Sequence, residues 1–162
     1  IIGPLINPLG ARNHTIGVYK QELVNMMANV VAEMDFNHVI VAYGMDGLDE
    51  ISLLGKTSIA EVRQKQIKYY EVTPEDFGLN RCSLDEIGGG SPDFNAQVIR
   101  DIFSGTERGP RRDFLVLNNA ATLYVSGKAV SIREGMDLSR SLIDSGAAQR
   151  KLQELVEKSR AV

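Results

Sequence analysis

Residues 14–44 of the chain, HTIGVYKQELVNMMANVVAEMDFNHVIVAYG, decide the fold. Residues 14–19 are rich in β-forming side chains and predict a short strand. Apolar side chains then recur at helical spacing and predict a helix with one apolar face, formed by Leu23, Met26, Met27, Val30, Val31 and Met34. Residues 38–43 are an almost unbroken apolar run, typical of a parallel-sheet strand that is covered on both faces. This order of strand, helix and strand predicts a βαβ unit with a right-handed crossover.

The rest of the chain adds a hairpin and a helical region. Residues 57–63 and 66–72 predict two antiparallel strands at an edge of the sheet, joined at Gln64 and Lys65. Helices are predicted from Pro92, capped by Ser91, to Gly105, from Pro110 through Ala121, over residues 131–145 and over residues 147–158. The sequence therefore predicts an α/β fold with a mostly parallel sheet, an edge hairpin and a helical C-terminal region.

Length and composition narrow the class of protein. The 162 residues fit one domain, and the 43% of hydrophobic and 24% of charged residues exclude a disordered or fibrous chain. The net charge of −3 argues against nucleic acid as a partner, because phosphate neutralisation needs a basic excess. No apolar run approaches the roughly 18 residues of a membrane span. The single cysteine, Cys82, cannot form an intramolecular disulfide, so we expect a cytoplasmic location.

An acidic segment follows the predicted buried strand. Asp46, Asp49 and Glu50 lie within residues 44–50, and ligands of open α/β sheets bind beside the carboxyl ends of the strands. Carboxylates are hard oxygen ligands that suit Mg²⁺. The segment therefore indicates a magnesium site, and a solvated acidic loop that caps the next helix is the structural alternative.

Other chemistry-bearing residues have weaker functional interpretations. The glycine run at 88–90 precedes a helix and could offer N–H groups to a phosphate, but it lacks the Gly-Lys-Ser/Thr of a P-loop, so a flexible helix entry is favoured. The remaining candidates are interpreted as structural: His14 and His38 as packed or rim histidines, Cys82 as a thiol without a histidine partner, and Arg108, Arg111 and Arg112 as a solvated helix entrance.

Four short motifs follow one another along the chain: GPLINP at residues 3–8, DGLDEIS at 46–52, GKT at 55–57 and LNNAA at 117–121. In this order and spacing they resemble the anthranilate phosphoribosyltransferase family over nearly the whole chain. The resemblance implies transfer of phosphoribosyl from phosphoribosyl pyrophosphate to the amine of anthranilate, with Mg²⁺, in tryptophan biosynthesis. It also implies a homodimer in which a small helical domain precedes a large α/β domain.

The resemblance assigns roles to four residues. The family's metal-binding Asp-Glu pair matches Asp49 and Glu50, and its anthranilate-contacting Gly-Pro matches Gly3 and Pro4. Three family features have no counterpart here because they lie upstream of Gly3: the Gly-Thr-Gly-Gly-Asp loop, the Lys-His-Gly-Asn segment and the arginine that holds the anthranilate carboxylate.

The chain starts at Ile1 rather than at a methionine, which together with the missing motifs predicts a truncated start. We therefore expect residues 1–162 to form part of a glycosyltransferase family 3-like catalytic domain without its N-terminal helical domain, inactive alone. Two alternatives stay open: a pyrimidine nucleoside phosphorylase-like enzyme, and a non-catalytic nucleic-acid-binding relative.

Overall fold

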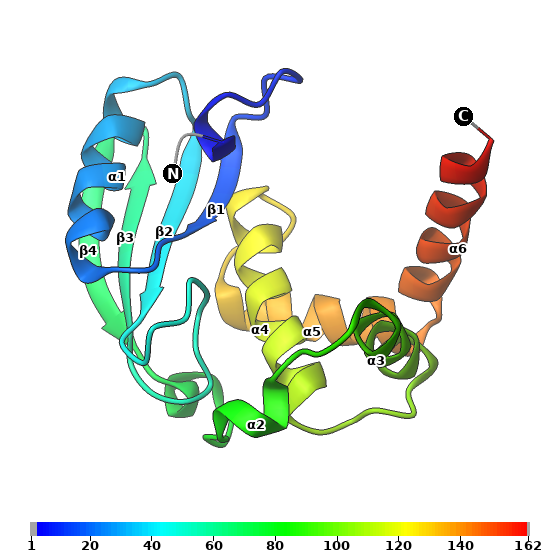
Figure 1. Cartoon of the computed structure of the whole chain (residues 1–162). Helices are drawn as coiled ribbons and strands as arrows, with labels where there is room; N and C mark the ends of the chain where they lie inside the picture. The colour runs from blue at the N-terminus through cyan, green and yellow to red at the C-terminus, as the bar shows by residue number, and fades with distance from the viewer. Residues whose placement is uncertain (1–2, 162) are drawn as a thin grey trace.

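The computed structural model describes residues 3–161 of the chain (Figure 1). Ile1, where the truncated start is expected, lies outside this range. The elements are η1 (Gly3–Leu5), β1 (Asn13–Gly17), α1 (Gln21–Glu33), β2 (His38–Gly44), β3 (Thr57–Arg63), β4 (Gln66–Val72), η2 (Pro74–Phe77), α2 (Leu84–Ile87), α3 (Pro92–Ser104), α4 (Pro110–Val125), α5 (Ile132–Asp144) and α6 (Ala147–Arg160), where η denotes a 3₁₀ turn. They form the expected α/β fold with its helical C-terminal region.

The described strands form one sheet in the order β1-β2-β3-β4. β1 pairs with β2 in parallel, which confirms the βαβ unit, and β4 is the outer strand of the predicted edge hairpin. The prediction of a mostly parallel sheet is wrong for these strands, because β3 pairs antiparallel with both β2 and β4. A loop, residues 45–56, joins β2 directly to β3. Within this described loop, no crossover helix carries the chain back to the start of the sheet, so β3 runs antiparallel to β2.

The apolar run of β2 reflects coverage on both faces rather than parallel pairing on both sides. Val39 and Val41 pack in a cluster with the buried side chains of α1, whereas Ile40 and Ala42 pack in a second cluster with those of α4. Successive strand residues point to opposite faces of a sheet, so alternate residues enter different cores. A central strand between two helical layers therefore has the same apolar profile in a mixed sheet.

Helix α1 is confirmed, but its buried face is rotated from the predicted one. The side chains that enter the core are Val24, Met27, Ala28 and Val31. Met26 and Val30 are 57% and 42% exposed. The predicted and the observed apolar residues both recur at helical spacing. The observed face includes Val24 and Ala28, which were not predicted to be buried, and it leaves Met26 and Val30 toward solvent.

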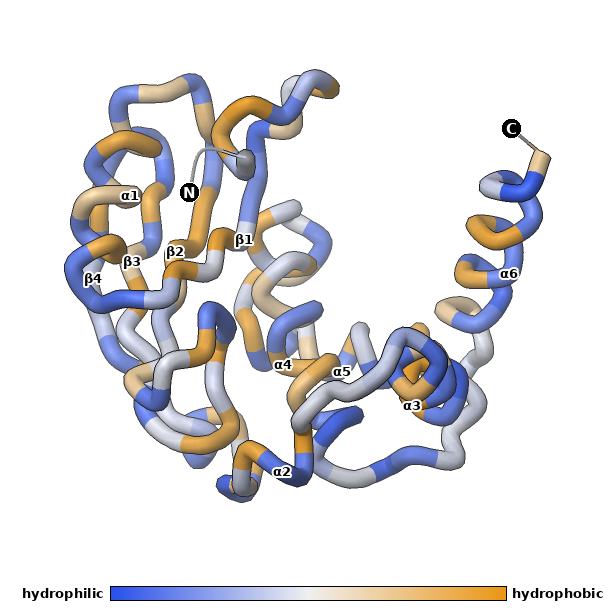
Figure 2. The backbone as a smooth tube through the Cα atoms, viewed as in Figure 1, coloured by the Kyte–Doolittle hydropathy of each residue, from blue (hydrophilic) through white to orange (hydrophobic). Residues whose placement is uncertain are grey.

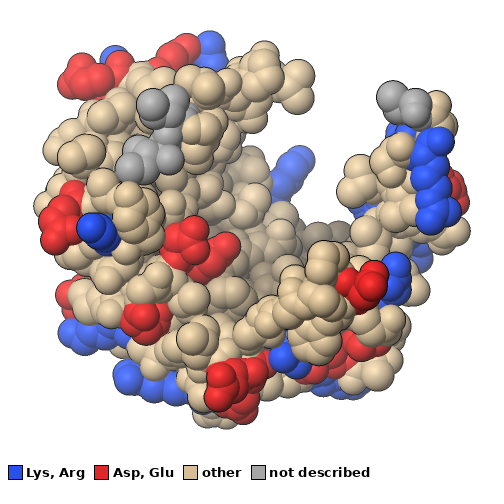
Figure 3. Space-filling view, viewed as in Figure 1, with Lys and Arg blue, Asp and Glu red and all other residues tan. Residues whose placement is uncertain are grey.

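The C-terminal helices begin and end close to the predicted residues. Ser91 caps α3, because its hydroxyl accepts a hydrogen bond from the Phe94 N–H at 3.2 Å. Helices α4 and α5 approach closely at Gly135, where a Cβ would lie 2.6 Å from the Ala120 carbonyl oxygen. Helix α6 has no buried residue, and its apolar turns are the orange bands of the tube (Figure 2). A hollow separates this helix from the sheet in the space-filling view (Figure 3). None of the helices in residues 3–161 is long and apolar enough to cross a bilayer.

Candidate functional site

The loop of residues 45–56, here called the acidic loop, leaves the carboxyl end of β2 and returns to β3. The Asp46 carboxylate holds this loop together, since it accepts hydrogen bonds from the Ser52 hydroxyl and, at 3.2 Å, from the Leu48 N–H. The Asp46 carboxylate is therefore occupied by hydrogen bonds inside the loop. Of the three acidic side chains of this segment, Asp49 and Glu50 remain as candidate metal ligands.

The GKT motif closes the same loop against the hairpin. Thr57 is fully buried and accepts a hydrogen bond from the Ser52 N–H at 2.9 Å. Lys56 forms an exposed ion pair with Glu71 of β4 at 2.8 Å. Both contacts fix where the loop ends, and neither aims a side chain at a ligand.

Asp49 and Glu50 lie on the surface at the end of β2, as predicted. Acidic side chains gather over this loop, on the face turned toward the hollow (Figure 3). Within the described part of the chain, neither carboxylate accepts a hydrogen bond or joins an ion pair of its own. Glu50 keeps contact with solvent, yet its surroundings partly desolvate the carboxylate; this desolvation and the charge of Asp49 raise the pKa of Glu50.

Glu50 lines a cavity of about 290 Å³. The opposite walls come from the connection between α2 and α3, at Gly88 and Gly89, and from Arg111 and Asn118 of α4. Asp49 is not among the lining residues. The two carboxylates therefore do not share this cavity: Glu50 borders it, and Asp49 is the exposed residue beside Glu50.

The carboxylate oxygens of Asp49 and Glu50 are suitable ligands for a Mg²⁺ ion that keeps several coordination positions free for other ligands. Two adjacent carboxylates with free oxygens are hard ligands, and a divalent cation relieves the repulsion between them. No group of three or more His, Cys, Asp or Glu side chains in residues 3–161 is arranged to enclose a metal ion. The pair therefore suits a magnesium ion that completes its coordination with water and substrate phosphates.

The backbone of the acidic loop is held from two sides. On one side Gly17, at the end of β1, touches the main chain of Asp49, and a Cβ at Gly17 would lie 1.6 Å from the Asp49 carbonyl oxygen. On the other side the Asn118 amide hydrogen bonds to the main chain of Ile51. The motifs at residues 46–52 and 117–121, far apart in sequence, thus meet at this loop.

The sequence assigned no role to Gly17, nor to Asn118, although Asn118 lies in the LNNAA motif at residues 117–121. Asn118 interrupts the apolar run of α4, and a polar amide between Leu117 and Ala120, both fully buried, is a signal that it hydrogen bonds inside the structure. No comparable signal marks Gly17 in the sequence, because a glycine within a strand can mark a bulge, a bend or the close approach of another backbone.

Gly3 and Pro4 lie far from the carboxylate pair. They form the exposed turn η1, and the neighbouring Leu5 shares a cavity with Met34 and Phe36, which precede β2. This turn is therefore at the amino ends of β1 and β2, whereas the acidic loop is at their carboxyl ends (Figure 1). The structure does not bring the two predicted sites together.

The glycine run and the arginine cluster act within the fold. The Gly90 N–H donates to the Asn95 side chain at 2.8 Å, so it is not free for a phosphate. The three arginines separate: Arg112 pairs with Asp144 at 2.6 Å, Arg108 donates to the Gly105 carbonyl at 2.9 Å, and Arg111 stacks on Phe94 with 5.4 Å between the guanidinium carbon and the ring centroid.

Cys82 has the properties of a structural thiol. Burial raises the pKa of its thiol, and the charges of Glu86, Asp113 and Asp46 raise it further. Arg81, the neighbour that could have lowered this pKa, is instead paired with Glu75 at 2.7 Å. The thiolate form that a nucleophile requires is therefore disfavoured.

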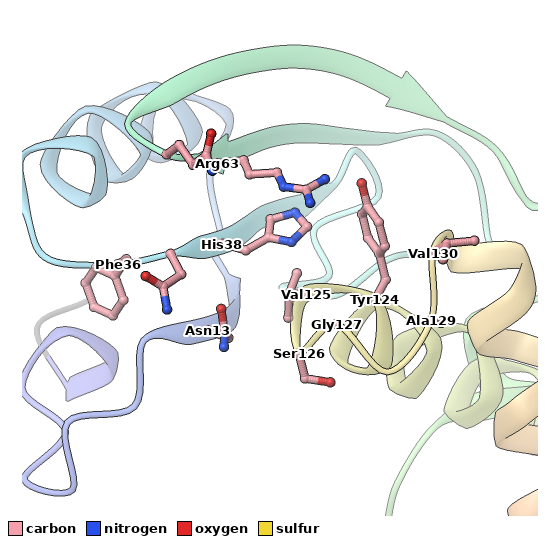
Figure 4. A pocket seen from close by; sticks show the side chains of 12 residues that line it. Asn13, Phe36, His38, Arg63, Tyr124, Val125, Ser126, Gly127, Ala129 and Val130 are labelled. Carbon is pink, nitrogen blue, oxygen red and sulfur yellow. The ribbon is translucent and has the colours of Figure 1, made fainter.

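A third cavity, of about 570 Å³, opens at the amino ends of β1 and β2 (Figure 4). His38 and Tyr124 line it, and their rings meet edge to face with centroids 4.8 Å apart. Glu61 joins both: its Oε1 lies 2.8 Å from His38 Nε2 and accepts the Tyr124 hydroxyl at 2.8 Å, while its Oε2 accepts the Tyr70 hydroxyl at 2.9 Å. Burial opposes ionisation of Glu61, but these hydrogen bonds outweigh it and lower its pKa.

The hydrogen bonds of Glu61 with His38, Tyr70 and Tyr124 connect α4 to the sheet. His38 is buried, as expected of a packed histidine. His14 is also a packing residue, since its ring meets Phe36 edge to face at 5.4 Å.

Comparison with known proteins identifies the family. Residues 1–149 match the family described as "Glycosyl transferase family, a/b domain". The chain belongs to this glycosyl transferase family. The match spans the acidic loop and α4, and it confirms the resemblance that the motifs predicted.

Relatives of the chain include anthranilate phosphoribosyltransferases. The enzyme of Methanobrevibacter smithii is 45% identical over 157 residues, which are 97% of this chain and 47% of that protein. The enzyme of Acetivibrio thermocellus is also 45% identical over 157 residues, 97% of this chain and 45% of that protein. The chain thus spans about half the length of the relatives it matches.

Solved structures agree with this assignment to the glycosyl transferase family. Anthranilate phosphoribosyltransferase from Thermus thermophilus superposes with a TM-score of 0.85 at 34% identity, over 96% of this chain and 46% of that one. The Saccharomyces cerevisiae enzyme in complex with PRPP and Mg has a TM-score of 0.87 at 26% identity, over 100% of this chain and 47% of that one.

Proposed function

We propose that the protein containing this chain is an anthranilate phosphoribosyltransferase. It transfers the phosphoribosyl group of phosphoribosyl pyrophosphate to the amine of anthranilate and releases pyrophosphate, a step of tryptophan biosynthesis. The observation that carries the proposal is the 45% identity to the M. smithii enzyme over 97% of the chain. The position of Asp49 and Glu50 at the carboxyl end of β2 supports it independently.

In the proposed reaction Asp49 and Glu50 hold Mg²⁺ through their carboxylates. When bound there, Mg²⁺ would supply positive charge to offset the charge that develops on the leaving pyrophosphate. A displacement of this kind at the sugar carbon depends on positioning and charge, and needs no nucleophilic side chain. The raised pKa of the Cys82 thiol agrees with that requirement.

The remaining substrate contacts extend beyond the acidic loop. From the resemblance alone, we assign Gly3 and Pro4 to anthranilate; in the structure their turn lies at the opposite end of β1 and β2 from the acidic loop. The groups that grip the pyrophosphate and the anthranilate carboxylate are expected in the half of the relatives that this chain does not cover. We further propose that the whole protein has a helical domain before this partial catalytic domain, and that it is a cytoplasmic homodimer.

The test is an assay of the purified full-length protein. We expect anthranilate fluorescence to fall only when phosphoribosyl pyrophosphate and Mg²⁺ are both present, with stoichiometric release of pyrophosphate. Incubation with pyrimidine nucleosides and phosphate tests the phosphorylase alternative. Phosphorolysis without anthranilate consumption would overturn the proposed function.

A further inference from the structure

The Asn118 side chain hydrogen bonds to both polar groups of Ile51. The Ile51 N–H donates to Asn118 Oδ1 at 2.9 Å, and Asn118 Nδ2 donates to the Ile51 carbonyl at 3.0 Å. Two residues of neighbouring antiparallel strands exchange hydrogen bonds in the same way. The side-chain amide thus replaces a strand partner and fixes the peptide planes on both sides of Ile51, one of which is the Glu50–Ile51 peptide.

The Asn118 amide is itself held in place. Its Nδ2 also donates to the Phe114 carbonyl at 3.1 Å, one turn earlier on α4. The adjacent Leu117 is fully buried and anchors this part of the helix in the core. The amide is therefore oriented before any ligand arrives, as is required of a group that positions others.

Asp49 and Glu50 depend on this support because their own side chains are not anchored. Among the described residues, no hydrogen bond or ion pair fixes either carboxylate, so their directions follow from the main chain of the acidic loop. That main chain is set by Gly17 on the side of Asp49 and by Asn118 on the side of Glu50.

We propose that Asn118 is a positioning residue that aims the Asp49–Glu50 pair for divalent-cation binding, an inference that rests on the proposed function. It acts through the Ile51 main chain, with which its amide oxygen and nitrogen both form hydrogen bonds. Residues that orient metal ligands in this way change metal affinity or activity by about 10- to 100-fold when they are replaced.

Asn119 provides a matched control on the same helix. Its Nδ2 donates to the Ser139 hydroxyl at 3.0 Å and so joins α4 to α5. Asn118→Leu and Asn119→Leu remove the same amide at adjacent positions, but only the first change frees the acidic loop. Asn118→Ser is a second variant that leaves room for water to satisfy the Ile51 main chain and so preserves folding.

The experiment uses the full-length protein and two readouts. The Mg²⁺ concentration that gives half-maximal turnover should rise about 10- to 100-fold in Asn118→Leu and Asn118→Ser and stay within about threefold in Asn119→Leu. The dissociation constant of Mn²⁺, titrated by electron paramagnetic resonance with phosphoribosyl pyrophosphate present, should rise in parallel.

The outcomes separate the inference from the proposed function. Unchanged Mn²⁺ binding in both Asn118 variants, or equal weakening in Asn119→Leu, would overturn the positioning role. An unaltered protein that binds Mn²⁺ but consumes no anthranilate would overturn the proposed function, and the Mn²⁺ titration would still decide the role of Asn118.

Discussion

Gly17 and Asp49 are in main-chain contact: a Cβ at residue 17 would lie 1.6 Å from the Asp49 carbonyl oxygen. No rearrangement of side chains can relieve an overlap of this size with a backbone atom. A glycine at the end of β1 is therefore what allows the acidic loop to rest against the sheet.

Gly17→Ala should displace the acidic loop and lower turnover of the full-length protein. Misplacement of a catalytic group by about 1 Å costs about 10²-fold in rate, so we expect a loss of that order, measured as kcat at saturating Mg²⁺. Gly78→Ala is the control, because residue 78 has a φ of 72° and no atom near an added Cβ. It should lower the melting temperature and leave kcat unchanged; equal losses of kcat in the two variants would contradict the contact's role.

Glu61→Gln should destabilise the fold at neutral pH. The glutamine amide cannot accept all of the hydrogen bonds that the carboxylate accepts from His38, Tyr124 and Tyr70. The loss of hydrogen bonds to a partly buried charge costs about 1–3 kcal/mol of the free energy of unfolding. Each kcal/mol lowers the melting temperature of a chain of this size by about 2–4 °C, which calorimetry at pH 7 measures.

The same variant predicts a pH dependence of stability. Because the folded state lowers the pKa of Glu61, its stabilisation is complete above the unfolded pKa, about 4.3, and is lost as the pH falls through the folded value. The difference in melting temperature between the unaltered protein and Glu61→Gln should therefore shrink below about pH 4. Glu71→Gln, which breaks only the exposed pair with Lys56, should change stability by less than about 1 kcal/mol. A difference for Glu61→Gln that grows on acidification would refute this account.

Cys82 should react slowly with alkylating reagents. Since burial and nearby carboxylates raise the pKa of its thiol, less thiolate is present at pH 7.5 than in an unfolded peptide. We expect iodoacetamide to modify the folded protein at least about threefold more slowly than the urea-unfolded protein, as followed by mass spectrometry. Faster labelling of the folded protein would mean that Cys82 has an activated thiolate.

The 162-residue chain alone should have no measurable transferase activity. Loss of a single well-placed donor in a charge-stabilising site costs about 10²–10³ in rate, and the family motifs that would supply several such donors are absent from this chain. Circular dichroism should first establish that the purified chain is folded. Anthranilate consumption by the folded chain near the rate of the full-length protein would contradict the expectation.

Local patterns predicted most of the elements, because periodicity and capping residues act over a few residues. The 38–43 run, the turn at Gln64 and Lys65, and the Ser91–Pro92 helix start are all found in the structure. The antiparallel pairing of β3 with β2 was not predictable from the same run, since a strand covered on both faces is apolar whichever way its neighbours run. Helix α2 was also missed, although Ser83 and Glu86 form a capping box.

The sequence is enough to propose the two candidate metal ligands, but it does not reveal the residues that hold their loop in place. Asp49 and Glu50 follow directly from the strand end and from the family motif. Asn118 contacts the acidic loop although it lies 67 residues after Ile51 in the sequence. Gly17 contacts the same loop from the end of β1. Such contacts depend on tertiary packing, which one sequence does not encode in any local pattern.

In the proposed function, Asp49 and Glu50 hold the Mg²⁺ of a phosphoribosyl transfer. The most direct measurement is a Mg²⁺ titration of turnover for full-length Asp49→Asn/Glu50→Gln beside Asp85→Asn/Glu86→Gln, which makes the same changes in an Asp-Glu pair of α2. We expect the first variant to stay folded and to lose at least about 10²-fold in kcat at every Mg²⁺ concentration, and the second to lose some thermal stability but keep its turnover. Unchanged turnover of Asp49→Asn/Glu50→Gln across the titration would contradict the account.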